Sequence, residues 1–449
     1  MMNKMISRRR FVAMTAAAGL FTIVPRHVLA GPGRTSPGEK LNIAGIGIGW
    51  MGSRNVRACG NENIVALCDV DHSYAAKTFK AFPKAARYKD YRAMLEKQKD
   101  IDAVFIATPD HTHAVISMAA MRAGKHVFCQ KPLTHDVYES RMLAKAAKEA
   151  GVVTQMGIQG HSGEGLRLIC EWIWGGGIGT VREVDAWCGL SYAPHGHAWW
   201  SSPLSDRPKG GQPVPVDLDW DLWIGPAPVR PYHSCYHPMV WRCWWDFGCG
   251  MMGDRGAHTL DPVFSALKLT HPTAIEGTGI VGGNAEVHPD KAVVTYQFPA
   301  REGFPPLKLT WYEGQEPQRP KELEDGRSLP PEGGVLFKGD KGTLLCGVYG
   351  DSPRLIPETA MQAYQRPPKT LPRIKGGHEQ DWIDAIKTGG KAGADFTYSG
   401  PLTEIALLGN IAKRFPNQRL LWDNVNLKVT NLNEANQWVR RPCRKGWSL

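Results

Sequence analysis

The chain has 449 residues, which is too long for one ordinary domain and predicts two domains with shorter appendages. Its composition, 42% hydrophobic and 22% charged without a long low-complexity tract, is that of a globular protein and excludes an intrinsically disordered chain. The basic residues are spread along the sequence rather than gathered in a block, which argues against nucleic-acid binding.

The first thirty residues have the pattern of an export signal. Ser7-Arg8-Arg9-Arg10-Phe11 is a twin-arginine motif, the run 12–24 is apolar, and Ala30 ends a small-residue cleavage site. The alternative, a membrane anchor, is disfavoured because the apolar run is shorter than the ~20 residues that span a bilayer. We predict a twin-arginine signal peptide over 1–30, a flexible leader over 31–40 and a periplasmic or otherwise exported mature protein without a stable membrane anchor. Five basic residues and no acidic residue leave with the signal, which lowers the net charge from +11 to +6.

The ten cysteines include no Cys-x-x-Cys pair, so neither a zinc ribbon nor a redox pair is indicated. Twin-arginine substrates fold before export in a reducing compartment, so we expect mostly buried free thiols. One bridge among Cys235, Cys243 and Cys249 stays open as an alternative. The histidines are scattered, and His195 and His197 lack an obvious third ligand, so we predict no metal site.

Strand and helix patterns alternate from Leu41 onwards. The predicted strands are 41–46, 63–69, 102–107, 126–129 and 152–156. One predicted helix starts near 50–51, and the others lie near 74–79, 113–123 and 137–149. Repeated β-α-β units of this length predict a doubly wound parallel sheet. We therefore assign residues 41–158 to a Rossmann dinucleotide-binding domain in a chain of the α/β class.

The pattern changes near Gln159. The stretch from Trp187 to Trp245 holds eight of the sixteen tryptophans and has no clear helical period. Strand-like segments follow at 273–281, 292–298, 307–313, 335–337 and 343–348, and two helical segments at 379–387 and 402–414 precede a polar tail. Runs of strands predict an open, largely antiparallel sheet, so residues 159–449 form a second α/β domain in this interpretation.

A glycine-rich turn directly follows the first predicted strand. Gly47-Ile48-Gly49-Trp50-Met51-Gly52 fits the G-x-G-x-x-G pattern, in which the glycines allow a tight turn, close approach to a pyrophosphate and helix–strand packing. Asp69 ends the second strand 22 residues after Gly47, where a carboxylate meets the adenosine ribose hydroxyls and repels a 2′-phosphate. The pattern therefore favours NAD over NADP. The alternative is a structural Asp in an ordinary strand-end turn.

Two further motifs carry candidate chemistry. Lys131-Pro132 follows a strand that should end at the ligand-binding edge of the sheet, although a surface lysine at the start of a loop is the alternative. Asp254 and His258 are four residues apart, so on a helix they share one face. A carboxylate beside a histidine orients the ring and raises its pKa, which suits a general base, although a structural pair is the alternative.

These motifs together resemble the glucose-fructose oxidoreductase, inositol dehydrogenase and rhizopine-catabolism (Gfo/Idh/MocA) family, over the chain from about Leu41 onwards. The resemblance rests on the glycine turn, Asp69, Ala107-Thr108-Pro109 with His113, Lys131-Pro132 and Asp254-x-x-x-His258. It implies a Rossmann domain followed by a substrate-binding and oligomerisation domain, and a homodimer or homotetramer. It also implies that Lys131 positions the reacting hydroxyl, that His258 accepts its proton and that Asp254 orients His258. Gln130 departs from the family, which usually has Glu at this position.

The predicted cofactor contacts are Gly47, Gly49, Trp50, Met51, Gly52, Asp69, Thr108, Pro109, His113, Gln130, Lys131 and Gln159. Aromatic faces cover the apolar faces of sugar rings, so the tryptophan-rich segment is the candidate sugar site. The predicted substrate contacts are His161, Tyr236, Trp241, Arg242 and Trp245, with Trp199, Trp200, Trp244 and Asp246 as further candidates. For any single aromatic residue here, a place in the core is the competing interpretation.

The compartment outside the cytoplasm is expected to lack a pool of free dinucleotide. An exported enzyme must therefore hold its NAD tightly and regenerate it in each cycle. The first hypothesis is an NAD-dependent oxidoreductase that transfers hydride between a sugar carbon and the nicotinamide. The second is a glycoside hydrolase that works by transient oxidation, elimination, hydration and re-reduction, as the resemblance to glycoside hydrolase family 109 implies; it needs no paired carboxylates. The third is a non-catalytic sugar-binding protein.

Overall fold

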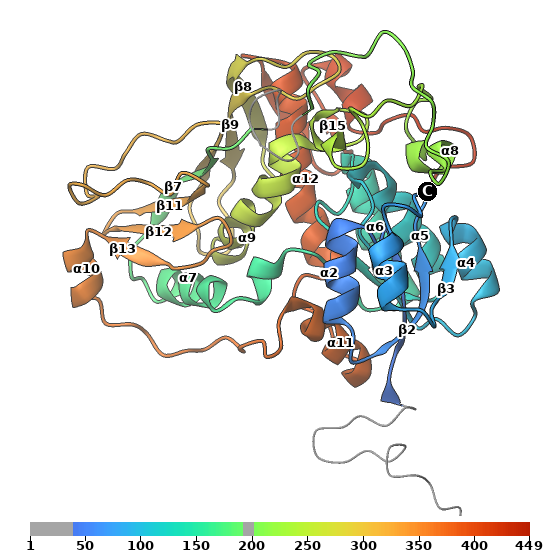
Figure 1. The fold of residues 1–449 in the computed structure, drawn as a ribbon. Coiled ribbons are helices and arrows are strands. Elements are labelled where there is room, and N and C mark those ends of the chain that lie inside the picture. Colours follow the sequence, from blue (N-terminus) through green and yellow to red (C-terminus); the bar gives the residue numbers. More distant parts are fainter. Residues whose placement is uncertain (1–38, 192–201) are drawn as a thin grey trace, which may run out of the picture.

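The computed structural model describes residues 39–191 and 202–449. The predicted signal peptide, His195, His197, Trp199 and Trp200 lie outside these ranges. Two domains stand side by side, with a parallel sheet and its helices on one side and an open sheet on the other (Figure 1). No helix within the described ranges is long and apolar enough to cross a membrane.

The first domain is a six-stranded parallel sheet in the order β3-β2-β1-β4-β5-β6, as the alternating pattern predicted. Its strands are β1 (Asn42–Ile46), β2 (Asn63–Cys68), β3 (Ala86–Tyr88), β4 (Ala103–Ile106), β5 (His126–Cys129) and β6 (Thr154–Met156). Its helices are α2 (Trp50–Ala58), α3 (Ala76–Ala81), α4 (Tyr91–Lys97), α5 (His113–Arg122) and α6 (Val137–Ala150). The short β3 and α4 were not anticipated.

The strand order reverses between β1 and β4, which are hydrogen-bonded neighbours. Such a switch point leaves a crevice at the carboxyl ends of the strands, where the following loops turn to opposite faces. The glycine turn after β1 and the segment Ala107–Pro109 after β4 border this crevice. Sequence-local signals hold the nearby helices in place: α6 begins with a capping box of Asp136 and Glu139 and ends at Gly151 in the left-handed conformation.

The second domain is a nine-stranded sheet in the order β13-β12-β11-β7-β10-β9-β8-β14-β15. Only the pair β7–β10 is parallel, so the expected open, largely antiparallel sheet is confirmed. The strands are β7 (Val181–Cys188), β8 (Ala274–Val281), β9 (Lys291–Phe298), β10 (Leu307–Glu313), β11 (Gly334–Gly339), β12 (Thr343–Gly347), β13 (Arg354–Ile356), β14 (Arg419–Asp423) and β15 (Lys428–Val429). The central β7 was not anticipated.

The helices of this domain are α7 (Glu164–Trp174), α8 (Trp220–Ile224), α9 (Ala257–Ala266), α10 (Glu358–Ala363), α11 (His378–Thr388) and α12 (Phe396–Arg414). The π-helical turn Met252–Gly256 leads directly into α9. The predicted helix began directly after Pro401. Helix α12 instead starts six residues earlier and accommodates Pro401 in its interior. It packs against α6 of the first domain as well as against β8, and so joins the two domains.

All ten cysteines are free thiols and nine of them are buried, so the alternative of a bridge among Cys235, Cys243 and Cys249 is not realised. Among the described residues, no group of three or more His, Cys, Asp or Glu side chains is placed to hold a metal ion.

Candidate active site

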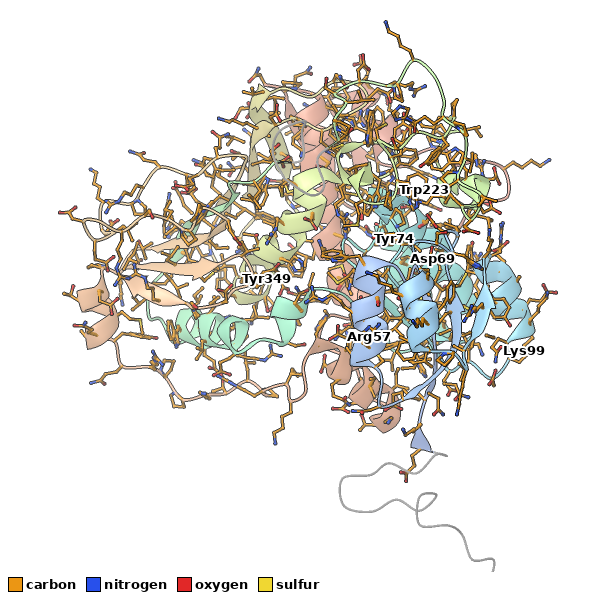
Figure 2. All side chains as sticks on the ribbon, in the orientation of Figure 1. Arg57, Asp69, Tyr74, Lys99, Trp223 and Tyr349 are labelled. Atoms are coloured by element: carbon orange, nitrogen blue, oxygen red, sulfur yellow. The ribbon has the colours of Figure 1, made fainter. Side chains whose placement is uncertain are left out.

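A pocket lies at the carboxyl ends of β1, β2, β4 and β5, and both domains contribute to its lining. Asp69, Tyr74 and Trp223 gather at this edge of the Rossmann sheet, and Tyr349 faces it from the second domain (Figure 2). The lining includes most of the predicted cofactor residues, namely Gly47, Gly49, Trp50, Met51, Asp69, Thr108, Pro109, His113, Gln130, Lys131 and Gln159. It also includes Asp254 and His258, so the three predicted catalytic side chains share one pocket with them.

The glycine turn has the geometry of a phosphate cradle. Gly47 has a φ of +71°, and a Cβ there would lie 2.7 Å from the backbone N of Thr108. Gly52 does not line the pocket, but a Cβ on it would lie 1.9 Å from the carbonyl oxygen of Gly47, so glycine lets α2 begin tight against β1. No side chain caps α2 at Gly49, which leaves the helix N-terminus available to an anion. The residues therefore fit the diphosphate of a dinucleotide.

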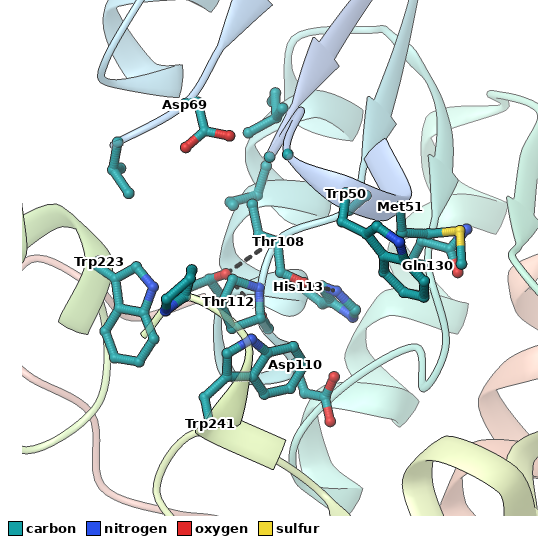
Figure 3. A pocket seen from close by; sticks show the side chains of 18 of the residues that line it. Trp50, Met51, Asp69, Thr108, Asp110, Thr112, His113, Gln130, Trp223 and Trp241 are labelled. Atoms are coloured by element: carbon teal, nitrogen blue, oxygen red, sulfur yellow. Dashed lines mark hydrogen bonds between the residues drawn. The ribbon is translucent and has the colours of Figure 1, made fainter. Parts of the chain in front are cut away.

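Gly49 serves an additional purpose. A Cβ there would lie 2.1 Å from Cε1 of Tyr74, so the turn is covered by a tyrosine ring that sequence reasoning did not assign. Farther along the same wall, Trp223 and Trp447 line the pocket (Figure 3 shows Trp223 on the Asp69 side). Trp447 is held by Arg92, whose guanidinium carbon lies 4.6 Å from the ring centroid. The predicted polar tail thus returns to the Rossmann domain, and aromatic rings enclose the end that Asp69 marks for adenosine.

Asp69 is buried at the end of β2. One carboxylate oxygen accepts from Ile48 N at 2.8 Å and the other accepts from Asp71 N at 3.0 Å, so the carboxylate is tied to the glycine turn. Burial raises the pKa of Asp69 to about 6, although these backbone hydrogen bonds oppose the rise. Each oxygen retains a lone pair for a ribose hydroxyl.

We expect the affinity for NAD to be constant above neutral pH and to fall as the pH drops through about 6, because protonation of Asp69 removes a charged acceptor. The variant Asp69→Asn should bind NAD at least about tenfold more weakly at pH 8 and should lose this pH dependence. Titration calorimetry over a pH series measures both effects. The exposed Asp325→Asn is the control, and an unchanged pH profile in Asp69→Asn would contradict the assignment.

His113 holds two loops of the site together. Its Nδ1 lies 2.7 Å from the carbonyl oxygen of Pro132 and its Nε2 lies 2.8 Å from that of Thr108, so both ring nitrogens face acceptors. Burial acts to lower its pKa, but Cys129, Asp110 and the Pro132 carbonyl outweigh it and raise the pKa to about 9. A doubly protonated ring satisfies both carbonyls. His113 is therefore placed to position the Lys131-Pro132 turn rather than to bind a cofactor with a free nitrogen.

Lys131 contacts the carboxylate of Asp254 through a short ion pair, and its Nζ donates to the backbone carbonyl of Asp254 at 3.2 Å. Burial lowers the pKa of Lys131 to about 7, Arg242 and Arg255 act in the same direction, and Asp110 opposes them. An amine with this pKa exchanges its proton readily at neutral pH.

The four-residue spacing predicted that Asp254 pairs with His258. In the structure Asp254 pairs with Lys131 instead. Asp254 lies in the π-helical turn and directs its carboxylate to Lys131. The expected rise in the pKa of His258 is wrong as well: burial and the charges of Lys131 and Arg255 hold it well below its usual value. His258 is buried, its Nδ1 has no hydrogen-bond partner among the described residues, and its ring centroid lies 4.8 Å from that of Tyr349.

The predicted substrate contacts divide into two groups. Trp241 and Arg242 line the pocket, with the guanidinium carbon 4.3 Å from the Trp241 ring centroid (Figure 3 shows Trp241 across from Asp110). His161, Tyr236 and Trp245 do not line it.

Each of the three residues outside the pocket has a structural partner. The Nδ1 of His161 lies 2.9 Å from Asp261 Oδ1, and the ring of Tyr236 packs in an aromatic core with Trp244. The ring of Trp245 stacks on Arg414, 3.8 Å from its guanidinium carbon. At these positions the structure agrees with the competing interpretation, in which the aromatic residues belong to the core. Asp246 likewise pairs with Arg230.

Sequence reasoning missed several lining residues. Tyr349 follows β12, and its hydroxyl accepts from Arg255 at 3.2 Å. Asp110 is buried, accepts from Cys249 N at 2.9 Å, and has a pKa raised by burial. Asp110 follows Ala107-Thr108-Pro109 at a strand end, which was an available signal, whereas no local pattern marks Tyr349.

The glycine turn and the buried Asp69 carboxylate, both at the carboxyl edge of the parallel sheet, define a pocket suited to a dinucleotide. Residues 41–158 match the model of the NAD-binding Rossmann-fold domain of the Gfo/Idh/MocA oxidoreductase family. Residues 193–297 match the model of the C-terminal α/β domain of the same family. Both matched segments are therefore similar to domains of the Gfo/Idh/MocA oxidoreductase family.

Curated relatives match parts of the chain. The levoglucosan dehydrogenase of Pseudarthrobacter phenanthrenivorans is 29% identical over 180 residues, which are 38% of this chain and 45% of that protein. The 1,5-anhydro-D-fructose reductase of Ensifer adhaerens is 33% identical over 26% of this chain and 34% of its own length. The inositol 2-dehydrogenase of Serratia proteamaculans is 31% identical over 31% of this chain and 43% of its own length. The chain thus spans less than half the length of these relatives.

Solved structures share the fold over most of the chain. Levoglucosan dehydrogenase in complex with NADH has a TM-score of 0.56 and 18% identity, and the match covers 84% of this chain and 98% of that one. The WlbA dehydrogenase of Bordetella pertussis, in complex with NADH and UDP-GlcNAcA, has a TM-score of 0.58 and 17% identity over 86% of this chain and 99% of that one.

Proposed function

We propose that this protein is an NAD-dependent oxidoreductase that acts on a hydroxyl-bearing carbon of a sugar or sugar derivative. The observation that carries the proposal is the convergence of Lys131, Asp254 and His258 in the same pocket as the glycine turn and Asp69. The matching relatives are enzymes named for small carbohydrates and inositol, which supports a polyhydroxylated substrate.

The nicotinamide supplies the hydride acceptor when the cofactor is bound. Lys131 is the candidate proton acceptor, because a pKa of about 7 leaves much of the amine neutral at physiological pH. Asp254 fixes the position of the Lys131 Nζ and stabilises the ammonium that forms. His258, held neutral by its surroundings, hydrogen-bonds the substrate hydroxyl. The family resemblance implied that His258 accepts the proton of the substrate hydroxyl. In this proposal Lys131 accepts it instead.

The twin-arginine motif supports an exported protein that retains its NAD through repeated cycles. Trp223 and Trp447, which line the Asp69 end of the pocket, support slow release of the adenosine moiety. The same two features favour the second candidate, a glycoside hydrolase whose oxidation and re-reduction cancel, because that reaction also leaves the cofactor unchanged after each turnover. Assembly into a homodimer or homotetramer through the open sheet is part of the proposal.

The test is to purify the mature protein without added dinucleotide, denature it and assay the supernatant for NAD(H) and NADP(H). We expect close to one NAD(H) per chain. A screen of glycosides and sugar pairs then separates net oxidation from net hydrolysis. Protein that contains no dinucleotide and also binds no added NAD would overturn both enzymatic proposals and favour a sugar-binding protein.

A further inference from the structure

We propose that Glu379 is a positioning residue which acts through Asn55 to fix the amide of Gln130 beside the nicotinamide end of the pocket. The three side chains come from α11, α2 and the loop after β5, so they link the second domain to the site. The inference rests on the proposed function in taking the occupant of the pocket to be a nicotinamide dinucleotide.

The two hydrogen bonds form a chain in which Gln130 donates to Asn55 and Asn55 donates to Glu379. Gln130 Nε2 donates to Asn55 Oδ1 at 3.0 Å, and Asn55 Nδ2 donates to Glu379 Oε1 at 2.9 Å. A carboxylate can only accept hydrogen bonds, so Asn55 must turn its amino group toward Glu379. Its carbonyl oxygen then necessarily faces position 130, and that position must supply a donor.

The packing leaves little room for another arrangement. Asn55 is only 3% exposed, so water cannot replace a lost partner without reorganisation. The amide of Gln130 lies on Gly157, where a Cβ would be 2.7 Å from Gln130 Cδ. With its Nε2 committed to Asn55, Gln130 keeps Oε1 as an acceptor, and because Gln130 lines the pocket, a hydroxyl of the nicotinamide ribose is the donor that we infer for it.

This relay accounts for an amide at position 130. A carboxylate there would set two acceptors, its own oxygen and Asn55 Oδ1, against each other. Rotating the Asn55 amide would remove that conflict but would set Asn55 Oδ1 against the Glu379 carboxylate instead. The substitution Glu379→Gln resolves the conflict, because the new amide at position 379 can donate to a rotated Asn55, whose amino group then serves the carboxylate at position 130. The relay thus predicts that the substitution at position 379 rescues the one at position 130.

The experiment compares the wild type with Gln130→Glu, Glu379→Gln and the double variant. Each protein is first unfolded and refolded to remove the dinucleotide that it retains, and its affinity for NADH is then measured by fluorescence titration. We expect Gln130→Glu to weaken binding about tenfold, Glu379→Gln to weaken it about threefold because an amide oxygen is a weaker acceptor for Asn55 Nδ2 than a carboxylate, and the double variant to recover to within about threefold of the wild type. Two exposed substitutions, Gln362→Glu and Glu96→Gln, are matched controls for the change of charge.

Wild-type affinity in Gln130→Glu, or a double variant no better than Gln130→Glu, would overturn the relay. If the wild type binds no dinucleotide, the proposed function fails, and the relay is judged from the thermal unfolding midpoints of the same four proteins without ligand. A midpoint lowered by Gln130→Glu and restored in the double variant then supports the relay. Additive shifts of the midpoint overturn it.

Discussion

The variant Lys131→Met should turn over its sugar about a thousandfold more slowly than the wild type while it still retains NAD(H). Methionine keeps much of the buried volume of the lysine stem but cannot exchange a proton, and a positioned acid or base contributes typically about 10²- to 10⁴-fold to a rate. The measurement is cofactor reduction followed by absorbance with the sugar found in the screen. The exposed Lys84→Met controls for the loss of a lysine, and retention of more than about a tenth of the activity in Lys131→Met would contradict the role.

The pH dependence of the same reaction separates Lys131 from His258. For sugar oxidation, kcat/KM should rise as the pH passes through about 7, because Lys131 accepts a proton only in its neutral form above its pKa. His258 is neutral throughout this range, so it should add no step of its own. In His258→Asn the rise near pH 7 should therefore persist at a lower rate, and its disappearance there would return the proton acceptor to His258.

The largest expected loss of stability follows from Lys413→Met. Lys413 on α12 is fully buried, and its Nζ lies 3.0 and 2.9 Å from the two carboxylate oxygens of Glu313 on β10. Removing the lysine leaves a buried carboxylate without its counter-charge, which costs roughly 3–5 kcal/mol. We expect a matching decrease in the free energy of unfolding, measured with urea.

Two further variants show whether that loss comes from the unpaired charge. In Lys413→Met/Glu313→Gln the charge is gone and the new amide still accepts from Trp311 Nε1, so we expect more than half of the loss to be recovered. The exposed pair Lys145–Glu149 gives the contrast, since Lys145→Met should change stability by less than about 0.5 kcal/mol. A Lys413→Met protein as stable as the wild type would contradict a structural role for the pair.

The Rossmann domain could be predicted because its signals are local. Buried parallel strands produce continuous apolar runs, and the glycine turn and Asp69 mark the ends of two of them. Two of the strands that the sequence did not predict, β3 and β7, have a pattern that is short or hidden by neighbouring residues. β3 has three residues, and β7 runs into the tryptophan-rich segment, whose many aromatic residues hide its alternation.

The sequence predicted many of the residues that line the site, but it did not predict which of their side chains contact each other. Lys131 and Asp254 are 123 residues apart in sequence, so no spacing rule could show that they form an ion pair. The four-residue spacing of Asp254 and His258 indicated a contact instead, but the π-helical turn and the nearby lysine redirect the carboxylate. Tyr349 and Trp447 reach the pocket through tertiary packing alone. Aromatic residues that were predicted as substrate contacts but lie outside the pocket, such as Tyr236, are buried in the core of a segment with little regular structure.

The position of Trp447 in the pocket wall has a consequence for biosynthesis. A ribosome delivers Gly47 and Asp69 long before Trp447, so a nascent chain carries the phosphate cradle while the aromatic wall beside it is still missing. A dinucleotide that binds at that stage meets an open groove and can leave again. We expect lasting capture of a dinucleotide only after Trp447 has been synthesised and has packed into the pocket wall.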